Sequence, residues 1–168
     1  MSDPQWIVLI VAALRVAELV YAARNSRHLL AAGGREVGAD HYPLFVLLHG
    51  GWLAALFFLV PADAPIHALP LAIFGVLLAV RAWVILSLGR YWTTRIITLP
   101  GTALVRSGPY RFVRHPNYLV VVGEIAILPL VFGAWPIALV FSLLNAALLW
   151  QRIRLEDTAL ASRRAIRS

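Results

Sequence analysis

The stretch Ile66–Leu88, IHALPLAIFGVLLAVRAWVILSL, decides the fold of this chain. It runs for 23 residues with Arg81 as its one charged side chain. A helix needs about 20 mostly apolar residues to cross a bilayer, so the stretch is predicted to be a transmembrane helix. Arg81 lies within it, where an ionisable group is costly, and we expect an acidic partner such as Glu124.

Four further apolar runs accompany this stretch. They are Gln5–Ala23, Pro43–Val60, Tyr118–Leu130 and Ala134–Trp150. The run at Tyr118 is short for a membrane crossing unless it begins near Asn117 and continues past Pro129. The segment Phe132–Pro136 is predicted to be the turn of a helical hairpin. We therefore expect an all-α integral membrane bundle of about five transmembrane helices, built as a single domain over residues 1–168.

The composition agrees with a bilayer as the surrounding solvent. Hydrophobic residues make up 61% of the chain and charged residues 14%, with a mean hydropathy of +0.78. Soluble domains carry about a quarter charged residues, so this chain has too little polar surface for a water-facing globule. The chain has no Cys, which excludes disulfides, thiolate nucleophiles and Cys-ligated metals. No metal site is expected.

The net charge of +7 is carried entirely by Arg and alternates along the connections. The first and third connections and the tail are basic, the second holds Asp63 and no Arg, and the fourth is uncharged. By the positive-inside rule, the basic segments are predicted to be cytoplasmic and the N-terminus, with Asp3, to lie outside. This placement favours membrane lipids as partners and not nucleic acid. The arginines concerned are Arg24, Arg27, Arg35, Arg90, Arg95, Arg106, Arg111, Arg114, Arg152, Arg154, Arg163, Arg164 and Arg167.

The third connection is the most informative part for chemistry. It reads RYWTTRIITLPGTALVRSGPYRFVRHPNY from Arg90 to Tyr118. It is too long for a tight turn and too rich in Trp, Tyr and Ile for a solvated linker, so we expect it to pack against the helix ends. Its Gly and Pro residues impose turns, which leave backbone N–H and C=O groups free to bind a ligand.

Two motifs in this part of the chain carry a family resemblance. The first consists of Leu104-Val105, Gly108-Pro109-Tyr110 and Arg114-His115-Pro116-Asn117-Tyr118. The second, Arg152-Ile153-Arg154-Leu155-Glu156-Asp157, is an Arg, three residues and an acidic pair after the last apolar run. Together they resemble the signature of isoprenylcysteine carboxyl methyltransferases and their bacterial relatives. The resemblance covers Arg90 to Leu160 well and the first two runs only in general character.

The resemblance implies an S-adenosylmethionine-dependent O-methyltransferase in the membrane. The expected acceptor is a lipophilic small molecule or a lipidated group, methylated on a carboxylate or phenolic oxygen. The details of Arg90–Ile97 and of Gly33-Gly34 resemble the bacterial branch that methylates small lipids. This implies a multi-pass protein of the bacterial inner membrane, with its active site facing the cytoplasm.

The resemblance also implies which residues form the site. The cofactor-binding part is about 90–160, and Arg152 is placed toward the reacting substrate. On a helix, Arg152 and Glu156 share one face, because they are four residues apart. Tyr110 and Tyr118 can offer an aromatic face to the sulfonium, and Glu156 can pair with a cation or accept from the ribose. The implied cofactor-binding residues are Thr102, Ala103, Leu104, Val105, Tyr110, His115, Pro116, Asn117, Tyr118 and Glu156.

Several residues admit two interpretations. Glu124, an acid within an apolar run, is a second catalytic candidate that could orient the acceptor or act as a base, but it could equally pair with an Arg. His49, beside Gly50-Gly51, could be a packing residue or a site residue. Arg15 and Glu18 could pair with each other at i,i+3. The His115-Pro116 pair could simply start a helix. Asp157 is interpreted as solvated or structural.

Two other classes of protein remain as alternatives. One is a membrane enzyme of the sterol-reductase type, which would use a nicotinamide cofactor. The other is a non-catalytic membrane scaffold or a haem-binding protein that uses two of its histidines. Cofactor binding distinguishes all three hypotheses.

Overall fold

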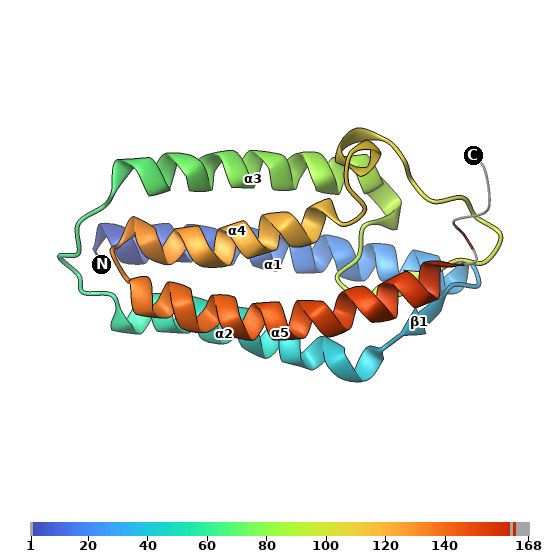
Figure 1. Cartoon of the computed structure of the whole chain (residues 1–168), viewed down its shortest axis with the longest axis horizontal. Coiled ribbons are helices and arrows are strands. Elements are labelled where there is room, and N and C mark those ends of the chain that lie inside the picture. Colours follow the sequence, from blue (N-terminus) through green and yellow to red (C-terminus); the bar gives the residue numbers. More distant parts are fainter. Residues whose placement is uncertain (1, 162, 164–168) are drawn as a thin grey trace.

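Five long helices run along the longest axis of the part of the chain that the structure describes (Figure 1). The computed structural model describes residues 2–161 and 163. The helices are α1 Asp3–Ala31, α2 Tyr42–Leu59, α3 Ala68–Leu88, α4 Pro116–Val131 and α5 Trp135–Leu160. The predicted all-α bundle is therefore confirmed.

The two ends of the bundle differ in charge. The α2–α3 connection and the α4–α5 turn lie at the end where α1 begins, which carries Asp3 and Asp63 (Figure 1). The opposite end, called the Arg-rich end below, holds the α1–α2 connection, most of the segment between α3 and α4, and the end of α5. Successive membrane crossings place alternate connections on opposite sides, and the charges of these connections alternate in the same way. Arg164 and Arg167 of the predicted basic tail lie outside the described residues.

Within the described residues, α1, α2, α3 and α5 are long and apolar enough to cross a membrane. Their outer faces expose large apolar side chains: Leu47 is 70% exposed, Phe58 77% and Leu86 79%. Contiguous apolar surface of this kind is rare on soluble monomers, whereas lipid-facing helices require it. The protein is a multi-pass membrane protein.

Helix α4 is shorter than the other four and lies more deeply within the bundle. Its 16 residues span about 24 Å at 1.5 Å per residue, less than the ~30 Å hydrocarbon core. Pro116 occupies its first turn, where no intrahelical N–H bond is needed, so the helix-start interpretation of this residue is confirmed. At the other end Gly133 adopts a left-handed φ of 69°, which forms the predicted hairpin turn.

Helices α1 and α5 continue well beyond the apolar runs that predicted them. Helix α1 extends to Ala31 instead of Ala23, and α5 extends to Leu160 instead of Trp150. The apolar pattern ends where a helix leaves the bilayer. The backbone hydrogen bonds of the helix continue beyond that point, so the helix is longer than its apolar run. The extension of α5 carries Arg152 into the Arg-rich end of the molecule.

A small sheet that the sequence did not predict joins the first and third connections. Strand β1, Arg35–Val37, pairs antiparallel with β2, Ile96–Thr98. Each strand has three residues, too few to show an alternating pattern in the sequence. An ion pair of 3.0 Å between Arg95 Nη1 and Glu36 Oε2 supports the pairing.

Four charged side chains within the bundle form a closed ring, called the charge ring below. Arg15 contacts Glu18 Oε2 and Glu124 Oε1, both at 2.9 Å. Arg81 contacts the same two carboxylates, at 2.7 Å and 3.0 Å. Two positive and two negative groups cancel, which is how charges are accommodated inside a membrane protein. The predicted pairs Arg15–Glu18 and Arg81–Glu124 are confirmed, and the ring links α1, α3 and α4.

Candidate functional site

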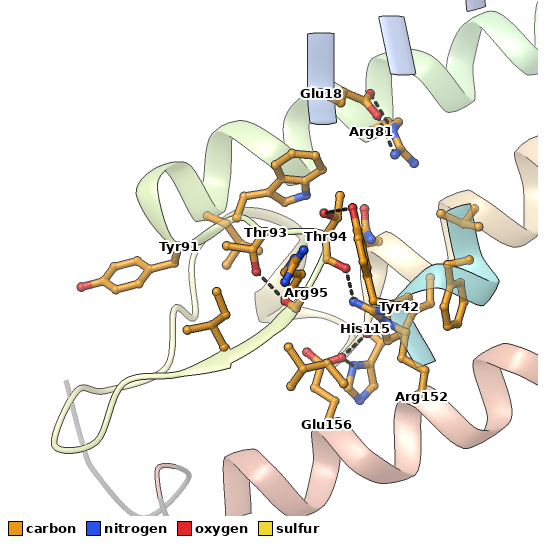
Figure 2. Close-up of a pocket in the computed structure, with 18 of the residues that line it drawn as sticks. Glu18, Tyr42, Arg81, Tyr91, Thr93, Thr94, Arg95, His115, Arg152 and Glu156 are labelled. Atoms are coloured by element: carbon orange, nitrogen blue, oxygen red, sulfur yellow. Dashed lines mark hydrogen bonds and ion pairs between the residues drawn. The ribbon is translucent and has the colours of Figure 1, made fainter. Parts of the chain in front are cut away.

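A cavity of about 870 Å³ lies between the charge ring and the Arg-rich end. Residues of all five helices and of the segment between α3 and α4 line it, and Figure 2 shows a selection of them. Arg15, Glu18 and Arg81 line its part within the bundle, whereas Arg152 and Glu156 line it from the extended part of α5. One cavity therefore joins the interior of a membrane bundle to the polar end of the molecule.

Arg152 is fixed at the cavity wall by two hydrogen bonds and an aromatic ring. Its Nε donates to the hydroxyl of Tyr118 at 2.9 Å, and its Nη2 donates to the carbonyl of Thr94 at 2.6 Å. The guanidinium carbon lies 4.9 Å from the ring centre of Phe45 on α2. Nη1 makes no hydrogen bond to any described residue, so it is available to a ligand in the cavity.

Glu156 lies one turn after Arg152, and Tyr118 connects the two. The Tyr118 hydroxyl donates to Glu156 Oε2 and accepts from Arg152, which confirms that both α5 residues share a face. The second carboxylate oxygen, Oε1, makes no hydrogen bond within the described chain. The site thus offers one cationic and one anionic group, bridged by the Tyr118 hydroxyl, and Figure 2 shows Arg152 and Glu156 on the same helix.

His115 completes this cluster. Its ring stacks on Tyr118 at 5.4 Å between ring centres, with an angle of 18° between the planes. Its Nε2 lies 3.1 Å from Asp157 Oδ1, and its Nδ1 lies 3.8 Å from Glu156 Oε2. The acidic pair therefore lies against the imidazole, and this contact favours the structural over the solvated interpretation of Asp157.

Other residues of the first motif form the neighbouring wall. Leu104, Val105, Tyr110 and Asn117 all line the cavity. Burial raises the pKa of the Tyr110 phenol, so this side chain stays neutral at physiological pH. Asn117 Oδ1 is buried and has no hydrogen-bond partner among the described residues. A buried acceptor without a partner is costly, and a ligand can satisfy it.

Three of the predicted cofactor-binding residues do not line the cavity in the described chain. The carbonyls of Thr102 and Ala103 accept from the guanidinium of Arg163, at 2.8 Å and 3.3 Å. Pro116 is buried at the start of α4. These residues shape the loop and the helix that present their neighbours, and their contact with a cofactor stays a prediction.

Glu124, the second catalytic candidate, lies behind the cavity wall in the charge ring. Its two oxygens accept from Arg15 and Arg81, and it is only 4% exposed. Both carboxylate oxygens are therefore occupied by guanidinium donors. Its role toward an acceptor stays a prediction, and the geometry favours support of the two arginines.

Sequence reasoning missed Thr94 and Phe45 as partners of Arg152 and left His49 undecided. A backbone carbonyl such as that of Thr94 has no signature in a sequence, and the approach of α2 to α5 is a long-range contact. His49 lines the cavity, so it belongs to the site region. The contact between the Arg152 guanidinium and the Phe45 ring is recognisable only once the fold is known.

Comparison with known proteins identifies the family. The isoprenylcysteine carboxyl methyltransferase family matches the chain over residues 68–162, more than half of its length. The chain belongs to this family. The matched part includes α3, α4, α5 and the whole segment between α3 and α4, and with them Arg152, Tyr118 and Glu156. The family is one of membrane methyltransferases, which agrees with the helical bundle.

Two bacterial relatives extend the similarity to the first two helices. The chain is 39% identical over 165 residues to the uncharacterized protein YpbQ of Bacillus subtilis, covering 92% of this chain and 95% of the relative. It is 29% identical over 160 residues to an uncharacterized protein of Haemophilus influenzae, covering 90% and 91%. No solved structure matches the chain significantly.

Proposed function

We propose that this membrane methyltransferase uses S-adenosylmethionine to methylate a carboxylate or phenolic oxygen of a lipophilic acceptor. The observation that carries the proposal is the chain of hydrogen bonds from Arg152 through Tyr118 to Glu156. This chain lies in the wall of a cavity that continues between membrane helices. These hydrogen bonds hold the cation of Arg152 close to the anion of Glu156. Arg152 would bind the acceptor, and Glu156 would bind the cofactor.

The residues present fit the cofactor. When bound, S-adenosylmethionine supplies an electrophilic methyl group on a sulfonium. Glu156 Oε1 would accept from its ammonium or ribose, and Asn117 Oδ1, which no described residue satisfies, would accept a further hydrogen bond. The stacked rings of His115 and Tyr118 offer an aromatic surface beside these acceptors.

Arg152 suits the acceptor. A guanidinium stays charged at any physiological pH, and Nη1 is free to contact a carboxylate or a developing phenolate. Phe45 and Tyr118 flank it and limit the access of water. Methyl transfer requires the acceptor oxygen to approach the methyl carbon in line with the bond that breaks. A rigidly held Arg152 therefore contributes mainly by positioning the acceptor.

The acceptor is proposed to arrive from the bilayer between α1 and α2. Val16 on α1 and Val46 on α2 both line the cavity, although they are 60% and 45% exposed on the outside of the bundle. The water-soluble cofactor would arrive at the Arg-rich end. We assign this end to the cytoplasm and the N-terminus to the outside of the bacterial inner membrane, from the distribution of arginines.

Calorimetric titration of the purified protein in detergent tests the proposal. We expect binding of S-adenosylmethionine, and a loss of more than ~1 kcal/mol in both Glu156→Gln and His115→Ala, because charged partners are involved. Asp63→Asn, at the opposite end, is the control and keeps the wild-type affinity. Unchanged affinity in both site variants contradicts the assignment. Binding of a nicotinamide cofactor instead, or a haem absorbance band, supports one of the alternative classes.

A further inference from the structure

His49 faces the cavity from the middle of α2, within the membrane part of the site. Six residues of α2 line the cavity at helical spacing: Tyr42, Phe45, Val46, His49, Gly50 and Leu53. Phe45 lies under the guanidinium of Arg152, and His49 follows four residues later, about 6 Å further along the helix axis at 1.5 Å per residue. His49 is therefore placed where an acceptor held by Arg152 would extend into the bundle.

The backbone fixes the tautomer of His49. Its Nδ1 lies 2.8 Å from the carbonyl oxygen of Phe45. A carbonyl only accepts, so Nδ1 carries the hydrogen and donates, and Nε2 of the neutral ring holds a lone pair. Within the described chain, Nε2 makes no hydrogen bond. The ring thus presents a proton acceptor to the cavity.

The other bases among the described residues that line the cavity have partners of their own. Glu18 accepts from Arg15 and Arg81, and His115 lies against Asp157. Glu156 accepts from Tyr118 through Oε2, and its Oε1 is assigned to the cofactor by the proposed function. Three arginines act electrostatically on His49: Arg15 from α1, Arg81 from α3 and Arg152 from α5. Glu18 and Glu156, on α1 and α5, line the same cavity. Arg15 and Arg81 are neutralised within the charge ring, so of these three arginines Arg152 is the one available to an anionic oxygen.

Building on the proposed methyl transfer, we propose that His49 is a catalytic base and that the acceptor is a phenol or enol. A carboxylate acceptor is ionised at neutral pH and needs no base, whereas a phenol has a pKa of about 10. The acceptor's O–H bond breaks and its proton moves to His49 Nε2. The oxygen forms a bond to the methyl carbon while the methyl–sulfur bond breaks, and the electron pair stays on sulfur as a thioether. The imidazolium then releases its proton to water at the Arg-rich end.

An ionisation measurement without the methyl donor tests the position of the base. The probe is a nitrophenol with a long alkyl chain, whose phenolate is followed by absorbance as the pH is varied. We expect His49→Gln to raise the pH at which the bound probe ionises by roughly one unit, because the proton acceptor is lost. His67→Gln, in the α2–α3 connection, leaves it unchanged. An unchanged midpoint in His49→Gln overturns the proposal.

A matched pair of acceptors tests the substrate class. Methyl transfer to an alkyl phenol and to a fatty acid of equal chain length is measured in the wild type and in His49→Gln. We expect loss of transfer to the phenol by about 10² to 10⁴-fold, with transfer to the fatty acid retained. In the variant, the phenol rate rises with pH, and added imidazole restores it in His49→Ala. Equal loss with both acceptors indicates a structural role and overturns the proposal.

The two proposals fail separately. Transfer by the wild type to the fatty acid alone overturns the role of His49 and leaves the proposed function intact. Transfer to neither acceptor, with S-adenosylmethionine unbound, contradicts the proposed function. In that case the ionisation of the bound nitrophenol still decides whether His49 accepts a proton.

Discussion

Arg152 and Tyr118, which come from different helices, are joined by a hydrogen bond of 2.9 Å from Nε to the phenolic oxygen. The same hydroxyl donates to Glu156, so one oxygen atom sets the position of both charged residues on α5. The cation and the anion of the site are thereby held in a fixed relation before any ligand binds. Preorganisation of this kind reduces the cost of binding and of reaching the transition state.

Removal of this hydroxyl tests its role. Tyr118→Phe keeps the ring that stacks on His115 but removes both hydrogen bonds. We expect kcat to fall about ten- to hundredfold, because hydrogen bonds to charged groups are lost. Steady-state kinetics measures this, with Tyr21→Phe on α1 as the control. A kcat equal to that of the wild type shows that Tyr118 does not position Arg152.

Substitution of Glu124 tests whether this residue supports the two arginines or takes part in catalysis. Glu124→Gln leaves Arg15 and Arg81 without one of their two carboxylates, and we expect a loss of roughly 3–5 kcal/mol in stability toward unfolding. Glu36→Gln breaks the surface pair with Arg95 and costs at most about 1 kcal/mol. Chemical unfolding in detergent measures both. A Glu124→Gln protein of normal stability and no turnover indicates a catalytic role instead.

A larger side chain at Gly50 tests whether the acceptor occupies the part of the cavity beside α2. It lines the cavity, and a Cβ built on it meets no atom within 4 Å. Gly50→Leu projects a side chain into this space, so we expect a higher KM for long-chain acceptors and an unchanged affinity for S-adenosylmethionine. Gly75→Leu on α3 is the matched control, since it also has open space but does not line the described cavity. Equal KM values in the two variants argue against an acceptor site beside α2.

The membrane topology is testable by labelling single introduced cysteines, because the chain has no Cys of its own that would react. Ala62→Cys lies in the α2–α3 connection and Ala161→Cys at the Arg-rich end, and both positions are exposed. A membrane-impermeant maleimide added to intact cells should label only Ala62→Cys. Labelling of both from the same side is incompatible with the proposed orientation.

The sequence predicts the bundle because a bilayer demands uninterrupted apolar stretches, and the run around Arg81 is one. It does not predict where α5 ends, since Arg152 and Glu156 lie beyond the apolar part of the helix, where apolarity no longer marks a helix. The partners within the charge ring were predicted as two pairs, but the closure of the ring depends on how three helices pack. The family motifs indicated the site on α4 and α5, whereas its α2 wall, with Phe45, carries no motif.

Transfer of a labelled methyl group from S-adenosylmethionine into a lipid extract by the purified protein tests the central claim most directly. We expect the wild type to label the lipid fraction. Arg152→Lys keeps the charge but loses the planar fork that contacts Tyr118 and Thr94, so its rate should fall about a hundredfold with little change in cofactor affinity. A folded, cofactor-binding wild type that labels no lipid, or an Arg152→Lys variant as fast as the wild type, contradicts the claim.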